Sequence, residues 1–138
     1  MKVLLLVSDN MEDVEALATR ALLMRAGLTV ETLTYSDALE LTTAFKLRIK
    51  VDGYAKYANP KDYDCLVIPG GPYVGEIIDR SDMIQNLAKE FKTLNKTIAA
   101  ICAGPRVLGR AGLLKDIRYT AFPGSEQDGK EGTYLPNE

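Results

Sequence analysis

Short, continuous hydrophobic runs recur along the chain and alternate with stretches of helical periodicity. A run of apolar residues bounded by turn residues is typical of a strand that is buried on both faces of a parallel sheet. The sequence predicts such strands over residues 3–7, 28–33, 65–68, 97–101 and 117–122.

The segments between these strands carry apolar residues at the spacing of an amphipathic helix. The first predicted helix begins after residues 8–10 and ends at Gly27, and around it Val14, Leu17, Ala21, Met24 and Leu28 recur at helical spacing. The second begins at Ser81, and its inner face is Ile84, Leu87, Ala88, Phe91 and Leu94. The third runs from Pro105 to Gly112, and these two residue types are common at the first helical position and just after the last.

Two further segments have weaker patterns. Apolar and charged residues alternate in places between positions 42 and 51, which indicates a half-exposed strand or a hairpin. Residues 123–138 show no apolar period, and we expect a loop or a weak hairpin there. Strands that alternate with helices predict an α/β fold with a doubly wound, mostly parallel sheet and helices on both faces. We expect one domain over residues 1–138.

Composition and charge exclude several classes of function. The chain is 46% hydrophobic and 26% charged, which is ordinary for a globular domain. A net charge of −2 gives no electrostatic footprint for nucleic acid or for an anionic membrane. The apolar run at 3–7 is far too short to span a membrane, and no signal-peptide cleavage site follows it. We therefore expect a cytoplasmic protein without nucleic-acid or membrane partners.

The chain contains two cysteines and no histidine. Two cysteines in a cytoplasmic chain favour free thiols over a disulfide framework. The absence of histidine excludes Ser-His and Cys-His pairs and any histidine metal site, and the carboxylates and thiols do not cluster at the spacing of metal ligands. We expect no metal and no cofactor.

Cys102 is the strongest candidate for chemistry. It follows a predicted buried strand and precedes Ala103-Gly104-Pro105 and a helix, which is the form of a nucleophile elbow at the carboxyl edge of the sheet. The amides at the start of that helix favour thiolate over thiol, so we expect the pKa of Cys102 to be lowered. The alternative is a small, inert core residue. Cys65 lies in the middle of a predicted strand, and for it we favour core packing.

A second candidate feature follows the neighbouring strand. Gly70 and Gly71 should reach the same sheet edge as Cys102, where their amides and that of Ala103 are positioned to form an oxyanion or anion pocket. The alternative is a plain tight turn.

These segments resemble a known family. Residues 99–105 (Ala-Ala-Ile-Cys-Ala-Gly-Pro), residues 67–71 (Val-Ile-Pro-Gly-Gly) and residues 24–27 (Met-Arg-Ala-Gly) are similar to motifs of the DJ/PfpI superfamily, and most similar to the branch of the Parkinsonism-associated protein deglycase. The resemblance covers essentially the whole chain. It implies a flavodoxin-like fold that dimerises, amide donors at Gly71 and Ala103, and a glutamate on the first helix that hydrogen-bonds the reactive cysteine. The matching position is Glu15.

Glu15 fits this role physically only under one condition. An ionised carboxylate beside a thiolate raises the pKa of the cysteine. The pair therefore works if Glu15 donates a proton in a hydrogen bond to sulfur, or if the two groups share one proton. The alternative is that Glu15 is only a first-turn acid that interacts with the helix dipole.

The chain also departs from the family pattern. Many relatives carry a histidine near the cysteine, where this chain has Ala103 or Phe122, so a peptidase lacks its base here. The family usually continues with another strand, a loop and a final helix. We therefore expect this chain to lack the C-terminal strand and helix and to be a fragment or to be completed by another copy.

Three functions remain open from the sequence. The resemblance implies a cofactor-independent glyoxalase- or deglycase-like enzyme, of hydro-lyase or hydrolase type rather than a peptidase, in which Cys102 attacks a small α-oxoaldehyde and Glu15 moves protons. The second is an oxidative-stress sensor or chaperone with an oxidisable Cys102. The third is a catalytically inactive binding scaffold. The expected partners are a small carbonyl substrate and a second copy in a homodimer.

Overall fold

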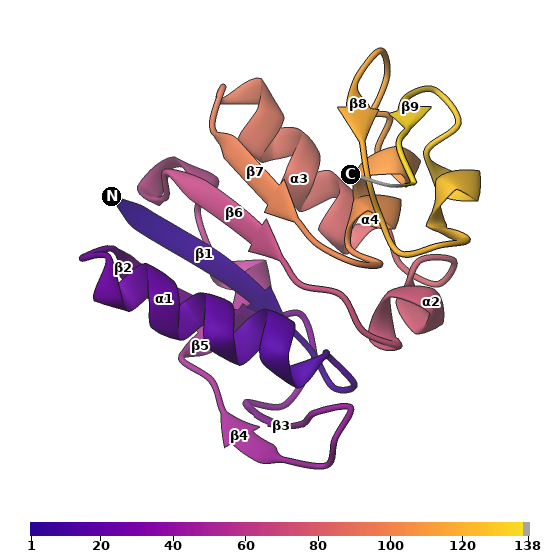
Figure 1. The fold of residues 1–138 in the computed structure, drawn as a ribbon. Helices are drawn as coiled ribbons and strands as arrows, with labels where there is room; N and C mark the ends of the chain where they lie inside the picture. The colour runs from indigo at the N-terminus through magenta and orange to yellow at the C-terminus, as the bar shows by residue number, and fades with distance from the viewer. Residues whose placement is uncertain (137–138) are drawn as a thin grey trace.

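The computed structural model describes residues 1–136 and is built around a five-stranded parallel sheet (Figure 1). The strand order is β5-β2-β1-β6-β7, which is the order of a doubly wound α/β fold. The strands are β1 (Lys2–Val7), β2 (Thr29–Thr34), β5 (Gly53–Tyr54), β6 (Cys65–Ile68) and β7 (Thr97–Ala100). The predicted fold class and four of the predicted strands are confirmed.

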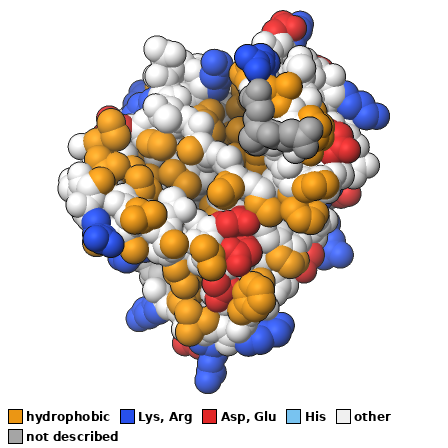
Figure 2. All heavy atoms as spheres, in the orientation of Figure 1, with side chains coloured by type: hydrophobic (Ala, Val, Ile, Leu, Met, Phe, Trp, Pro, Cys, Tyr) orange, Lys and Arg blue, Asp and Glu red, His pale blue; other side chains and the backbone are white. Residues whose placement is uncertain are grey.

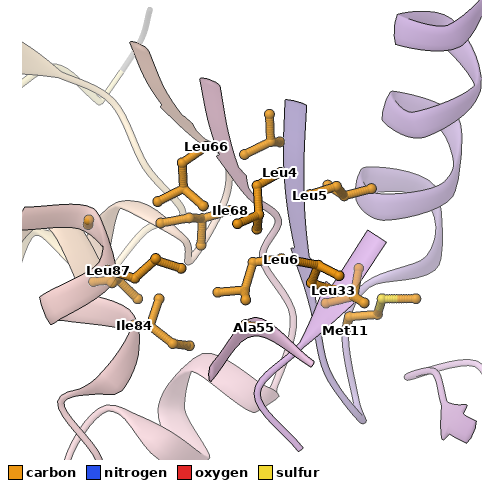
Figure 3. Packing of buried hydrophobic residues seen from close by; sticks show 14 of the residues in the cluster. Leu4, Leu5, Leu6, Met11, Leu33, Ala55, Leu66, Ile68, Ile84 and Leu87 are labelled. Atoms are coloured by element: carbon orange, nitrogen blue, oxygen red, sulfur yellow. The ribbon is translucent and has the colours of Figure 1, made fainter. Parts of the chain in front are cut away.

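The central strand explains why a continuous apolar run predicts its position. Residues 3–7 are all buried, because helices cover both faces of the sheet. Figure 3 shows Leu6 pointing toward Ile84 and Leu87, whereas Leu5 points the opposite way, toward the first helix. Both faces of β1 therefore contribute to the hydrophobic core. The stabilisation that such a core provides grows with the apolar area that it removes from water.

Helical segments flank the sheet. The first covers one face as a π-helical turn, η1 (Val14–Ala18), that continues into α1 (Thr19–Arg25). On the other side lie α3 (Met83–Thr93) and α4 (Pro105–Arg110), and the short α2 (Tyr73–Ile77), which the sequence did not predict, follows β6. Within residues 1–136, no helix is long and apolar enough to cross a membrane.

The predicted apolar face of the first helix is only partly right. Leu17 and Leu28 pack against the core, but Val14 and Met24 are 68% and 47% exposed, and Ala16, which was not in the predicted set, is fully buried. A π turn holds more residues than an α turn and so rotates the positions that follow it. A count at the α-helical period therefore assigns some residues wrongly to the sheet side. Figure 2, drawn in the orientation of Figure 1, shows apolar side chains spread over the surface on that side of the molecule, around a group of acidic side chains.

The segment at 42–51 forms the second of the two predicted structures, a hairpin. Strand β3 (Glu40–Thr42) pairs antiparallel with β4 (Arg48–Lys50) outside the main sheet. Two 3-10 turns, η2 (Ala55–Tyr57) and η3 (Pro60–Asp62), then lead into β6.

The last part of the chain differs from the prediction. The strand expected at 117–122 is reduced to β8 (Arg118–Tyr119), which pairs in parallel with β9 (Thr133–Tyr134) and does not join the main sheet. Between them, η4 (Ser125–Asp128) folds back onto α4. Asp128 holds this segment through Nε of Arg106, at 2.5 Å, and Nε of Arg110, at 2.6 Å. Because polar contacts rather than an apolar stripe position it, hydrophobic periodicity gives no sign of this segment.

Candidate functional site

Cys102 occupies a sharp turn between β7 and α4. Its φ of +60° is left-handed, a conformation that non-glycine residues adopt rarely and that often marks a functional position. The turn is tied to β6 by the amide of Ile101, which donates to the carbonyl of Ile68 at 3.2 Å. A Cβ on Gly104 would lie 2.6 Å from that same carbonyl oxygen, so only glycine fits there. The predicted elbow geometry is confirmed.

Glu15 reaches the elbow from the π-helical turn η1. The Glu12 carboxylate accepts a hydrogen bond from the Glu15 amide at 2.8 Å, and the Glu12 amide donates to the carbonyl of Gly70 at 3.0 Å. The beginning of the first helix is therefore fixed against the loop after β6. Isolated π turns occur frequently at functional sites, because they present a side chain that a regular helix would turn away.

Gly70 is the point where the glutamate and the cysteine meet. Its amide donates to Oε2 of Glu15 at 2.6 Å. A Cβ at this position would lie 2.6 Å from Glu15 Oε2, 2.8 Å from Cys102 Cβ and 2.9 Å from the nitrogen of Ala103. The missing side chain allows all three groups to converge. The structure thus brings Gly70, Cys102 and Ala103 together, as the strand order predicts, and adds Glu15, as the family resemblance implies.

Gly70 and Gly71, the two glycines after β6, have different surroundings. The Gly70 amide already donates to the Glu15 carboxylate, so in this structure its anionic acceptor is a side chain of the protein. Gly71 has a φ of +122°, and a Cβ on it would clash with the backbone of residues 10–12. Gly71 lies beside Cys102 and Ala103 in the wall of the same pocket. The amide of Ala103 donates to the Cys102 sulfur.

An open pocket of 550 Å³ gives small molecules access to Cys102. Glu12, Gly71 and Pro72 line one part of the pocket, and residues 122–125 and 127 of the C-terminal segment line another. The Phe122 amide donates to the carbonyl of Cys102 at 2.8 Å, which joins this segment to the elbow. The volume suits a small metabolite.

The sequence over residues 1–135 matches the DJ-1/PfpI family. The chain belongs to this family. It is 32% identical over 128 residues to a deglycase of Pyrococcus abyssi, covering 93% of this chain and 76% of that protein. It is also 32% identical over 123 residues to the protein DJ-1 homolog B of Arabidopsis thaliana, covering 88% of this chain but only 28% of that longer protein.

Solved structures of the DJ-1 superfamily have the same fold. The Agrobacterium tumefaciens protein Atu0886 superposes with a TM-score of 0.84 at 26% identity, covering 99% of this chain and 74% of that one. The oxidized DJ-1 of Toxoplasma gondii superposes with a TM-score of 0.80 at 32% identity, covering 92% and 70% of the two chains. The family fold therefore extends across nearly the whole of the described chain.

The expectation that Cys102 has a lowered pKa is wrong for this DJ-1/PfpI chain. Partial burial, the hydrogen bond with Glu15 and the negative charges of Glu15 and Glu12 raise the pKa of Cys102 to about 11, and only the Ala103 amide opposes them. Helix α4 has six residues, so its dipole is small beside the adjacent carboxylate. Burial and the charge of Asp64 also raise the pKa of Cys65. Both thiols therefore have raised pKa values, and Cys102 also lines an open pocket.

Arg106 is the site residue that sequence reasoning missed. It lines the Cys102 pocket from the first turn of α4. A cation at a helix start is disfavoured by the helix dipole, and this mismatch was the available signal. Its partner Asp128 lies in a segment without periodicity, so the pair was not recognisable from the sequence.

Proposed function

We propose that this chain is a cysteine-dependent enzyme that converts small α-oxoaldehydes without a cofactor, in the manner of a glyoxalase or deglycase. One observation carries the proposal. The Gly70 amide holds the Glu15 carboxylate against the Cys102 elbow, beside an open pocket of 550 Å³. The deglycase names of archaeal relatives at 31–32% identity add support.

The geometry suits a reaction in which one carboxyl group moves every proton. The sulfur of Cys102 adds to the aldehyde carbon, and its proton passes through Glu15 to the aldehyde oxygen, which gives a hemithioacetal. Glu15 then removes the proton from that carbon and returns it to the adjacent carbonyl carbon, and it moves the hydroxyl proton of the hemithioacetal to the oxygen of that carbonyl, which leaves a thioester of a 2-hydroxy acid. Water hydrolyses the thioester and releases the hydroxy acid and the free thiol. Methylglyoxal plus water gives lactate in this balance.

The amide of Ala103 has the position of an oxyanion donor in this scheme. It donates to the sulfur in the free protein, and in this scheme it turns to the oxygen on the carbon that the sulfur attacks. The Gly70 amide has a different role, because it orients the Glu15 carboxylate by donating to Oε2.

Methylglyoxal turnover tests the proposal. The wild-type protein, Cys102→Ser and Glu15→Gln are incubated with methylglyoxal, lactate is quantified, and the mass of the Cys102 peptide is recorded, with Cys65→Ala as the matched control. We expect lactate from wild type and Cys65→Ala only. A Cys102 adduct or oxidation product without lactate would instead support a redox sensor, and no product with no modification would support a binding scaffold.

We also propose a homodimer as the working assembly. The exposed apolar residues of the first helix and of the β3–β4 hairpin, with Val14, Leu22 and Phe45 at 68%, 61% and 74% exposure, offer a surface that a second copy would cover. Light scattering of wild type and Leu22→Lys tests this, and a monomeric wild type would contradict it.

A further inference from the structure

Arg106 is the one cationic side chain among the described residues that line the Cys102 pocket. Its side chain is 22% exposed, and its Nε donates to Oδ2 of Asp128 at 2.5 Å. Within residues 1–136, Asp128 is the only hydrogen-bond or ion-pair partner of its guanidinium. The guanidinium thus has one edge fixed by the protein and its Nη groups without a protein acceptor.

The surrounding residues hold this guanidinium in place. The side chain of Asp128 is only 6% exposed and is shared with Arg110, which also pairs with Asp79 at 2.8 Å. On the other side, a Cβ on Gly75 would lie 3.4 Å from Nη1 of Arg106, so the group rests against α2. No buried side-chain nitrogen or oxygen in the described part of the chain lacks a partner, so the unpaired Nη donors are open to solvent.

A guanidinium with a free edge binds a carboxylate through two parallel hydrogen bonds. The two arginines and the two aspartates of this network sum to zero charge, and Glu12 adds a negative charge to the pocket wall. The pocket therefore accommodates a ligand with one negative charge better than a ligand with two, which favours a carboxylate over a phosphate dianion. Repulsion from Glu12 would direct that carboxylate toward Arg106.

We propose that Arg106 binds the carboxylate of the substrate, so that the preferred substrates are small aldehydes with a carboxylate away from the reacting carbonyl. The reaction of these aldehydes rests on the proposed function above, but the carboxylate site does not. With the carboxylate on Arg106, the carbonyl end of the molecule is left to Cys102, which lines the same pocket.

Paired alkylating reagents test the site without any turnover. Iodoacetate and iodoacetamide differ only in charge, and 3-maleimidopropionate and N-ethylmaleimide form a longer pair. The rate of Cys102 modification by each reagent is measured by peptide mass spectrometry, and the anionic-to-neutral ratio cancels the intrinsic reactivity of the thiol. Arg106→Gln is compared with Arg110→Gln, which removes the same charge and the same kind of contact with Asp128 but does not line the pocket.

We expect Arg106→Gln to lower this ratio about fivefold to tenfold for at least one reagent pair, and Arg110→Gln to change it by less than about twofold. An unchanged ratio in Arg106→Gln for both pairs would overturn the proposal. Equal falls in both variants would overturn it too, since they would indicate long-range charge alone. Equal slowing of anionic and neutral reagents in Arg106→Gln would indicate a purely structural arginine.

Turnover then separates this proposal from the function on which it draws. Methylglyoxal is compared with 4,5-dioxopentanoate, an α-oxoaldehyde that ends in a carboxylate. We expect Arg106→Gln to raise the KM for the anionic aldehyde about tenfold more than that for methylglyoxal. Equal effects on both aldehydes would overturn the substrate assignment. No turnover of either, with the reagent ratio still dependent on Arg106, would refute the enzyme and retain the carboxylate site.

Discussion

Replacing Glu15 with glutamine should make Cys102 a better nucleophile toward alkylating reagents and a worse catalyst. The Glu15 carboxylate opposes the thiolate by its hydrogen bond and by its charge, and these are the second and third causes that raise the pKa of Cys102. Glutamine has the same shape, and its amide oxygen still accepts the Gly70 amide. The variant removes the charge, so the pKa of the thiol must fall.

The structure limits how far it falls. The pKa of Cys102 rises from 9.0 to about 11, and burial, the largest cause, persists in the variant. We therefore expect a fall of about one pKa unit, which gives about ten times more thiolate at neutral pH. Because a thiolate of lower pKa is intrinsically less nucleophilic, the net gain in alkylation rate is about threefold to fourfold.

Iodoacetamide labelling across about pH 7 to 11, read at the Cys102 peptide, measures both the pKa and the rate. Turnover of methylglyoxal in Glu15→Gln should fall by about 10²-fold or more, because an amide moves no proton. Glu12→Gln is the matched control, since the Glu12 charge is the smallest of the causes. A Cys102 pKa that is unchanged or higher in Glu15→Gln would refute this reasoning.

Three further predictions concern Gly70, Asp128 and the alkaline stability of the protein. Gly70→Ala forces a Cβ to within 2.6 Å of Glu15 Oε2, so we expect it to destabilise the fold by about 1–3 kcal/mol in urea unfolding and to abolish turnover. Gly53→Ala meets only one side-chain atom, at 3.3 Å, and should cost less. Asp128→Ala leaves Arg106 and Arg110 without their shared partner, so we expect it to lower the free energy of unfolding by about 1–3 kcal/mol and to speed proteolysis of the C-terminal segment. Proteolysis of the variant at the wild-type rate would contradict this. Folding raises the pKa of Cys102, so the contribution of its protonated thiol to stability is complete below pH 9.0 and is lost as pH rises through about 11. Cys102→Ala should therefore lose less stability than wild type over this alkaline range, measured by urea unfolding at each pH. An identical loss of stability in both proteins would count against this prediction.

The parts of the fold that depend on apolar burial were predictable from the sequence. Strand β1 is a continuous apolar run because both of its faces are covered, and the inner face of α3 repeats at helical spacing because that helix is regular. The apolar face of the first helix was only partly assigned because the π turn at Val14–Ala18 breaks that spacing. The segment around Asp128 was missed because ion pairs position it, and ion pairs leave no period in the sequence.

The site was predictable only in part. A cysteine after a buried strand and before Gly-Pro identifies the elbow, since few residue orders suit so sharp a turn. Glu15 came from the family resemblance, because one acid among several in a first turn carries no local signal. The acceptor of the Gly70 amide is not predictable from the sequence, because strand order places two loops at one sheet edge without giving hydrogen-bond partners. The raised pKa of Cys102 depends on those contacts in three dimensions.

The raised pKa also bears on the choice between an enzyme and a peroxide sensor. Peroxide reacts with thiolate, and a thiol with a pKa of about 11 is only about 0.03% thiolate at pH 7.5. Addition to an aldehyde has a different requirement, because the new C–S bond forms as a proton reaches the aldehyde oxygen. A protonated Cys102 beside the Glu15 carboxylate holds that proton and the group that moves it. This arrangement supports the proposed carbonyl addition over peroxide sensing. Oxidation of Cys102 by peroxide at neutral pH should accordingly be slow in wild type and faster in Glu15→Gln. Fast oxidation that is indifferent to Glu15 would favour the sensor.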